Sequence, residues 1–261
     1  MLKNSQKMNL MKKSSWYFAV LFIFIISACK NESSDPTPMI TNNPQGNATR
    51  ILPIGASRVE GFRPAYESYR YELWKLFIDN DNNVDLIGSL KDEFSYPTYK
   101  NLSFDTDHEG RGGATSGQIL EAVTNTIDGI IEQSGMPEFV LFSTPGGNDG
   151  LENLPFDQAV KNVNAIIDLL QAKIPNVTII LEKAAPPNSN SEERIKSFLD
   201  NMNAEVTRIA MEQSNESSKV ILVDMNTGFT DSLLADPVHY NEAGAKFIAQ
   251  RYYDLLKDKL N

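Results

Sequence analysis

The strongest constraint on the fold is a regular change of hydrophobic pattern along the chain. From Arg50 onward, short continuous apolar runs alternate with longer stretches whose apolar residues recur every three or four positions. Continuous runs indicate strands buried on both faces, and the longer spacing indicates helices with one apolar side. The alternation therefore predicts an α/β fold, a three-layer α/β/α domain with a mostly parallel sheet.

Five strands are expected, and they cover residues 50–55, 84–88, 138–143, 176–181 and 219–224. Pro53 lies inside the first strand and has no amide hydrogen for the sheet ladder, so we expect that strand to be short or locally unpaired there. The helical spacing predicts a helix that begins near Pro64 and others through 119–130, 160–170, 191–213 and 241–256.

The first 29 residues predict an export signal. Four lysines precede an apolar run over residues 16–26, which is too short for a membrane-spanning helix of ~20 residues. The run ends in Ser27, Ala28 and Cys29, which resembles the lipobox of bacterial lipoproteins. The resemblance implies that Cys29 is lipidated and becomes the new N-terminus. Lys30 stands where an aspartate commonly retains lipoproteins in the inner membrane, so we expect an outer-membrane location.

The remainder divides into a tether and a domain. Residues 30–48 are rich in Asn, Ser, Pro and Thr and predict a flexible tether, whereas 49–261 predict the folded domain. Cys29 is the only cysteine, so no disulfide is expected within the domain. Without the four leader lysines the chain has 20 basic and 34 acidic residues, a formal net charge near −14. Such a surface repels nucleic acid, so no nucleic-acid partner is expected.

Polar residues lie in the segments that follow three of the predicted strands. Ser57 comes after the first strand, Asn148 after the third, and Asp236 and His239 after the fifth. In open parallel sheets the ligand site lies beyond the carboxyl ends of the strands. These residues are therefore expected at one edge of the sheet, where His239, one of two histidines, follows a carboxylate by three positions.

Four blocks in this order resemble the SGNH hydrolases, also called the GDSL esterase family. They are Gly55-Ala56-Ser57, the glycines of residues 111–115, Gly146-Gly147-Asn148-Asp149 and Asp236-Pro237-Val238-His239. The resemblance covers about residues 50–258 and implies a flavodoxin-like α/β/α fold with a five-stranded sheet. Stretches at residues 69–74, 84–89 and 107–110 look like those of acetyl xylan esterases of carbohydrate esterase family 3.

The resemblance implies a role for each site residue. Ser57 would be the nucleophile, His239 the base that takes its proton, and Asp236 the acid that orients the imidazole. The oxyanion hole would consist of the main-chain amides of Ser57 and Gly113 and the side-chain amide of Asn148. This chemistry needs no cofactor and no metal.

Other readings of these residues remain open. Ser57 could cap a helix, Asp236 could stabilise a turn, and Gly146 and Gly147 could form one. His108 lies among carboxylates, which could suggest a metal site, although a solvated loop or a place near the cleft is the simpler interpretation.

One position departs from the family pattern. The family usually carries an aspartate where this chain has Ala56. Its loss would remove hydrogen bonds near the nucleophile and could leave Ser57 less tightly placed.

The expected function is hydrolysis of acyl esters of carbohydrate, with acetyl as the first candidate. Two alternatives remain: a lipase- or thioesterase-like hydrolase of the same superfamily, and a surface lipoprotein that binds glycan without turning it over.

Overall fold

The computed structural model describes residues 40–41 and 46–260. The predicted export signal, Cys29 and most of the predicted tether lie outside the described residues. Two tether residues, Ile40–Thr41 (β1), pair in parallel with Leu102–Ser103 (β5). In these described ranges, no helix combines the length and the apolar character that crossing a bilayer requires.

The central sheet runs through the middle of the domain and is almost entirely parallel. Its seven strands are β2 (Thr49–Gly55), β3 (Val84–Leu86), β4 (Leu90–Lys91), β6 (Asp107–Gly110), β7 (Phe139–Phe142), β8 (Thr178–Lys183) and β9 (Lys219–Asp224). They are ordered β4-β6-β2-β7-β8-β9, with β3 paired to β2, and only β4 with β6 is antiparallel. The five predicted strands are confirmed as β2, β3, β7, β8 and β9.

The expected strand count of five is wrong, because β4 and β6 belong to the same sheet. Neither strand carries a continuous apolar run. In β6, His108 and Glu109 are each 2% exposed, and each has a polar partner outside the strand: Asp92 for His108 and Ser89 for Glu109. Polar partners of this kind leave no periodic signal in the sequence.

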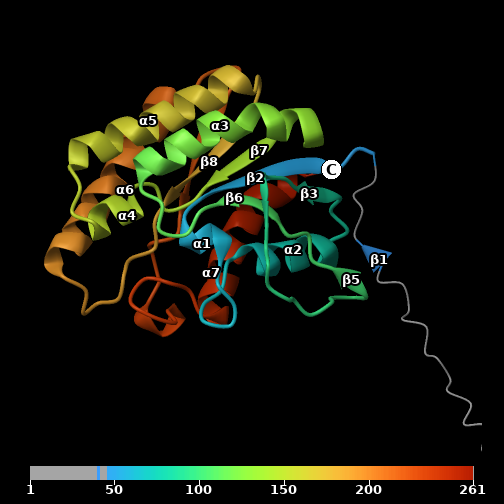
Figure 1. Ribbon diagram of the computed structural model, residues 1–261, viewed down its shortest axis with the longest axis horizontal. Helices are drawn as coiled ribbons and strands as arrows, with labels where there is room; N and C mark the ends of the chain where they lie inside the picture. The colour runs from blue at the N-terminus through green and yellow to red at the C-terminus, as the bar shows by residue number, and fades with distance from the viewer. Residues whose placement is uncertain (1–39, 42–45, 261) are drawn as a thin grey trace, which may run out of the picture. The chain divides into compact units, whose positions relative to one another are not determined.

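Helices cover both faces of the sheet, as Figure 1 shows. One face carries α2 (Arg70–Asp79) and α7 (Glu242–Leu256), and the other carries α3 (Ser116–Ser134), α5 (Phe156–Lys173) and α6 (Glu193–Gln213). Neighbouring residues of one strand serve opposite faces, since Ile51 packs with α2 and α7 while Leu52 packs with α3 and α5. The α/β/α prediction is confirmed.

Short elements occupy the connections. These are α1 (Ser57–Glu60), α4 (Gly147–Leu151) and the 3₁₀ turn η1 (Asp231–Leu233), and a second 3₁₀ turn, η2 (Lys257–Lys259), follows α7. Both α1 and α4 follow the carboxyl end of a strand, so they begin at the edge where the polar motifs were expected.

Pro53 does not shorten β2, but on one flank the strand is unpaired at this residue, which is the second of the two expected outcomes. It stands in register with Leu141 of β7. The carbonyls of Ile51 and Gly55, two residues to either side, accept bonds from Ile87 and Arg111 on the opposite flank. Since alternate residues of a strand direct their main-chain groups to the same neighbour, the Pro53 nitrogen faces that flank, where β3 ends and β6 begins. The hydrogen-bond donor that Pro53 lacks is therefore absent at the place where the partner of β2 changes from β3 to β6.

The helix expected to begin near Pro64 begins at Arg70 instead. Residues 61–69 form a folded turn, in which the amide of Phe62 donates to the Tyr66 carbonyl (3.2 Å). The Glu67 amide donates to the carbonyl of Tyr240 (2.9 Å). These bonds to a segment far along the chain compete successfully with a local helix.

Candidate active site

Ser57 lies at the sharp passage from β2 into α1. Gly55 has φ +150°, and a Cβ there would lie 2.9 Å from the Ser143 carbonyl oxygen and 2.8 Å from a methyl group of Val59. A residue with a side chain would not fit without movement. The N-cap of α1 is Ala56, whose carbonyl accepts the first helical bonds, so Ser57 is not the cap.

The side chain of Ser57 instead meets His239. The distance from Ser57 Oγ to His239 Nε2 is 2.8 Å, and the distance from His239 Nδ1 to Asp236 Oδ2 is 2.7 Å. The second Asp236 oxygen accepts the main-chain amides of Val238 (2.8 Å) and His239 (2.7 Å). Asp236 therefore stabilises a turn and contacts the imidazole at the same time.

The ionisation of Asp236 determines which nitrogen of His239 carries the proton. Partial burial favours the neutral carboxyl, but bonds from the Val238 amide and from His239 hold the pKa of Asp236 below its usual range. An ionised Asp236 can only accept, so Nδ1 donates to it. This leaves the lone pair of Nε2 directed at the hydroxyl of Ser57.

Arg58 was missed by the sequence analysis, although it adjoins Ser57. Its guanidinium is buried and donates to the carbonyls of Val238 (2.8 Å) and Ala185 (2.9 Å). It also lies 4.7 Å from the centre of the Tyr240 ring. Arg58 thus joins the serine turn to the histidine loop.

Tyr66 was also missed. Its ring stacks on the imidazole of His239 with a centroid separation of 3.8 Å and an interplanar angle of 9°. Stacking leaves the imidazole few orientations other than the one that faces Ser57. No local pattern could have predicted this contact, because the two residues come from opposite ends of the domain.

Asn148 lies in the first turn of α4 and lines the same cavity as Ser57 and His239. Its Nδ2 donates one hydrogen to the carbonyl of Ala114 (2.8 Å). An amide nitrogen has two hydrogens, so one remains for a ligand. Gly113, the residue before Ala114, has φ +75° and no atom within 4 Å of a Cβ position. The predicted oxyanion residues Asn148 and Gly113 are therefore joined through Ala114.

The cavity at Ser57 is small and mostly apolar. Its volume is about 40 Å³. Its apolar lining includes Leu151, Pro187, Ile195, Leu199 and Val238. A cavity of this size admits a group of a few heavy atoms.

Glu182 is a third residue that the sequence did not single out. It is fully buried and accepts bonds from Ser143 Oγ (2.7 Å), Thr144 Oγ1 (3.1 Å) and the Tyr252 hydroxyl (3.0 Å). Burial raises its pKa. Thr144 lines the cavity, so Glu182 contacts the cavity wall through the Thr144 hydroxyl.

His108 does not lie in a solvated loop, as had been expected. Its Nδ1 accepts the Gly110 amide (3.0 Å) and its Nε2 lies 3.2 Å from Asp92, which is paired with Arg70 at 2.5 Å. Burial lowers the pKa of His108, so the ring is neutral with both nitrogens engaged. Among the residues that the structure describes, no group of three or more His, Cys, Asp or Glu could hold a metal ion.

The site therefore has the arrangement found in serine hydrolases, in which a hydroxyl, an imidazole and a carboxylate are in contact beside a free amide hydrogen. Residues 88–247 match the GDSL-like lipase/acylhydrolase family. The chain belongs to that family, and hence to the carboxylic ester hydrolases. The matched region includes Gly113, Asn148, Asp236 and His239, whereas Ser57 precedes it.

Similar solved structures are esterases with the same fold. One is a carbohydrate esterase family 3 protein from Talaromyces cellulolyticus, with 23% identity, TM-score 0.65, and coverage of 80% of this chain and 99% of that one. An acetyl esterase mutant with an acetate ion has 25% identity, TM-score 0.65 and the same coverage. An acetyl xylan esterase has 16% identity and TM-score 0.57, over 79% of this chain and 99% of that one. The comparison with curated proteins returned no match.

Proposed function

We propose that this protein is a serine esterase that removes short acyl groups, above all acetyl, from carbohydrate. The observation that carries the proposal is the continuous contact from Asp236 through His239 to Ser57 beside the Asn148 amide. The family and the names of similar structures, which include an acetyl esterase and an acetyl xylan esterase, support it.

The site residues would act in two half-reactions. Ser57 Oγ attacks the ester carbonyl carbon while its proton moves to His239 Nε2, and the carbonyl electron pair moves to oxygen. The side chain of Asn148 and the amides of Ser57 and Gly113 donate to this oxyanion. Its collapse breaks the bond to the alcohol oxygen, which takes the proton from His239. Water, deprotonated by His239, then attacks the acyl-serine and releases the carboxylic acid and Ser57.

The dimensions of the site favour a small acyl group and a large alcohol. The cavity at Ser57 measures about 40 Å³. A larger hollow, of about 580 Å³, adjoins the cavity at Ser57 and shares Pro187 and Leu199 with it. Another, of about 410 Å³, has no lining residue in common with that cavity. A short acyl group fits the small cavity, and a sugar residue requires the larger space.

Hydrolysis of a series of p-nitrophenyl esters tests the proposal. Acetate should be the best substrate, and Ser57→Ala and His239→Ala should each reduce kcat by about 10³-fold or more while circular dichroism shows folded protein. A preference for octanoate would favour the lipase- or thioesterase-like alternative. Equal activity of the variants and the parent would refute the triad, and inactivity of all three would favour the non-catalytic glycan binder.

We further propose that the protein is exported and anchored by a lipid on Cys29, at the outer membrane. The support is the apolar leader that ends in Ser27, Ala28 and Cys29. Expression of the full chain in a bacterium, with fractionation of the membranes, is the test. Cys29→Ser should move the protein out of the membrane fraction, and an unchanged distribution would refute the lipid anchor.

A further inference from the structure

An exposed aromatic ring lies close to the proposed catalytic residues. Phe62 is 53% exposed and is the one exposed aromatic side chain among residues 46–260. Its ring centre lies 6.0 Å from that of Tyr66, which in turn stacks on His239. A single exposed ring is common on protein surfaces, so the significance of Phe62 depends on what surrounds it.

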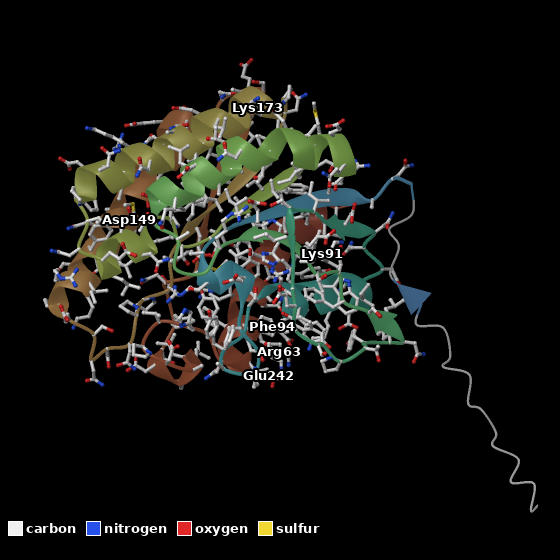
Figure 2. All side chains as sticks on the ribbon, viewed as in Figure 1. Arg63, Lys91, Phe94, Asp149, Lys173 and Glu242 are labelled. Carbon is white, nitrogen blue, oxygen red and sulfur yellow. The ribbon has the colours of Figure 1, made fainter. Side chains whose placement is uncertain are left out.

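The position of Phe62 is fixed by main-chain bonds. The Phe62 amide donates to the Tyr66 carbonyl (3.2 Å) and the Tyr66 amide donates back (3.1 Å). Arg63 lies between them in sequence, is paired with Glu67 at 3.2 Å, and lies 4.8 Å from the centre of the Tyr96 ring. Figure 2 labels Arg63 and Phe94 in the same part of the domain. The ring is therefore presented on a rigid turn.

Phe62 and Phe94 together line a hollow. Their rings meet edge to face, with centres 5.2 Å apart and planes at 77°. The hollow has a volume of about 410 Å³. Its polar lining includes Glu60, Glu93, Lys91 and His108. Two apolar rings beside hydrogen-bond acceptors offer contacts both to the C–H faces and to the hydroxyls of a sugar.

Glu60 connects this hollow with the proposed oxyanion loop. It lies three residues after Ser57, at the end of α1. A Cβ on Gly112 would lie 2.2 Å from its Oε2, so the carboxylate of Glu60 lies against the loop that carries Gly113. A ligand bonded to Glu60 would therefore lie beside the loop that carries Gly113, at the opposite end of α1 from Ser57.

The charge of the hollow selects among ligands. The side-chain carboxylates of Glu60 and Glu93 form no hydrogen bond or ion pair within residues 46–260, whereas Lys91 is paired with Asp107 at 2.7 Å. Two uncompensated carboxylates repel phosphate and carboxylate ligands. A site for a quaternary ammonium needs aromatic rings on several sides of the cation. Here one face of Tyr66 is covered by His239, and only Phe62 and Phe94 remain, so a quaternary ammonium is not the expected ligand.

We propose that Phe62, Phe94, Glu60 and Glu93 form a subsite for neutral pyranose residues of a polysaccharide main chain. The inference rests on the proposed esterase function and adds the class of alcohol and the surface that holds it. The sugar packs against the rings and donates hydroxyl hydrogens to the carboxylates, while its acylated neighbour reaches Ser57.

Binding and turnover are measured separately to test the subsite. Isothermal titration with xylotetraose, cellotetraose and mannotetraose, which carry no ester, reports on the subsite alone. At least one of these tetrasaccharides should bind to the unmodified protein. Phe62→Ala and Phe94→Ala should each weaken that binding about tenfold. Glu60→Gln should weaken it less, since an amide oxygen still accepts a bond. Met211→Ala removes another exposed apolar side chain and is the matched control.

Turnover gives a second measurement. The ratio of kcat/KM on acetylated xylotetraose to kcat/KM on p-nitrophenyl acetate should fall about tenfold in Phe62→Ala and stay unchanged in Met211→Ala. If no tetrasaccharide binds the parent, or if choline binds and the sugars do not, the subsite is refuted. If p-nitrophenyl acetate is not hydrolysed by the parent, the esterase proposal fails, whatever the titrations show.

Discussion

At the scale of single residues, the site depends on side chains that perform two tasks each. Asp236 closes the turn that carries His239 and also accepts the hydrogen of its ring. Arg58 extends from the serine helix to a carbonyl of the same turn. The orientation of the imidazole therefore depends on bonds that also hold the loop.

Replacing the carboxylate of Asp236 should disable the imidazole. In Asp236→Asn the amide can donate to Nδ1, which favours the tautomer whose Nε2 carries a hydrogen and cannot accept the Ser57 proton. We expect kcat on p-nitrophenyl acetate to fall by ~10³–10⁴-fold. Asp128→Asn, an exposed aspartate on α3, is the control. Activity within tenfold of the parent would contradict the role given to Asp236.

At the scale of elements, the loop between β9 and α7 is held at its far end by Asn241. The Oδ1 of Asn241 caps α7 by accepting the Gly244 amide (3.0 Å). Its Nδ2 donates to the carbonyls of Ser232 (2.8 Å) and Leu234 (3.2 Å). The helix start and the loop that carries His239 are consequently one unit.

Asn241→Ala should destabilise the domain and slow the reaction. Loss of the cap costs ~0.5–2 kcal/mol of unfolding free energy, and two carbonyls lose a donor. The melting temperature should fall by a few degrees, and kcat should fall with it because the loop is loosened. Asn241→Asp keeps the cap but loses both donated bonds, so it should recover part of the stability. Equal melting temperatures for the alanine variant and the parent would argue against this coupling.

The segment before β6 introduces a pH dependence. Burial raises the pKa of Asp105 to about 7, against bonds from the Leu86 and Asp107 amides. The folded state then retains a proton that the unfolded chain releases near pH 4. Stability is therefore lost as pH rises from about 4 to about 7.

Asp105→Asn should remove this loss, because an amide side chain does not titrate. Its amide oxygen can still accept the hydrogen bond from the Leu86 amide. The melting temperature of the variant relative to the parent should rise between pH 5 and pH 8. Measurement at each pH unit, with Asp128→Asn as the exposed control, gives the comparison. A constant difference between variant and parent across this range would show that Asp105 titrates normally.

At the scale of the whole molecule, stability resides in the two apolar layers that sandwich the sheet. Ile180 of β8 is fully buried among residues from α2, α7 and β9. Shortening the Ile180 side chain leaves a cavity that the packed layers cannot easily close.

Ile180→Ala should cost ~2–5 kcal/mol of unfolding free energy and Ile180→Val ~0.5–1.5 kcal/mol. Denaturant unfolding measures both. The ratio of acetate to octanoate hydrolysis should not change, because Ile180 does not line the cavity at Ser57. A cost below ~1 kcal/mol for the alanine variant would mean that the layer relaxes more than a close-packed core allows.

The sequence by itself determined the layered fold and the edge where the polar motifs lie. Both follow from local patterns: buried strands and one-sided helices have their own spacing, and the residues after parallel strands share an edge. Ser57, Asn148, Asp236 and His239 could be placed at that edge on this basis, and the resemblance to the SGNH hydrolases implied their roles.

Only the tertiary structure decided how these residues are held. Ser57 and His239 meet across 182 positions of sequence, and Arg58 contacts Val238 across 180. Tyr66 stacks on His239 from the other end of the domain, and Glu182 contacts Ser143 across 39 positions. The burial of His108 and the strand β6 depend likewise on Arg70 and Asp92. Periodicity records which side of an element is buried, but the partner of a buried polar group is set by packing between distant segments, so no local pattern contains it.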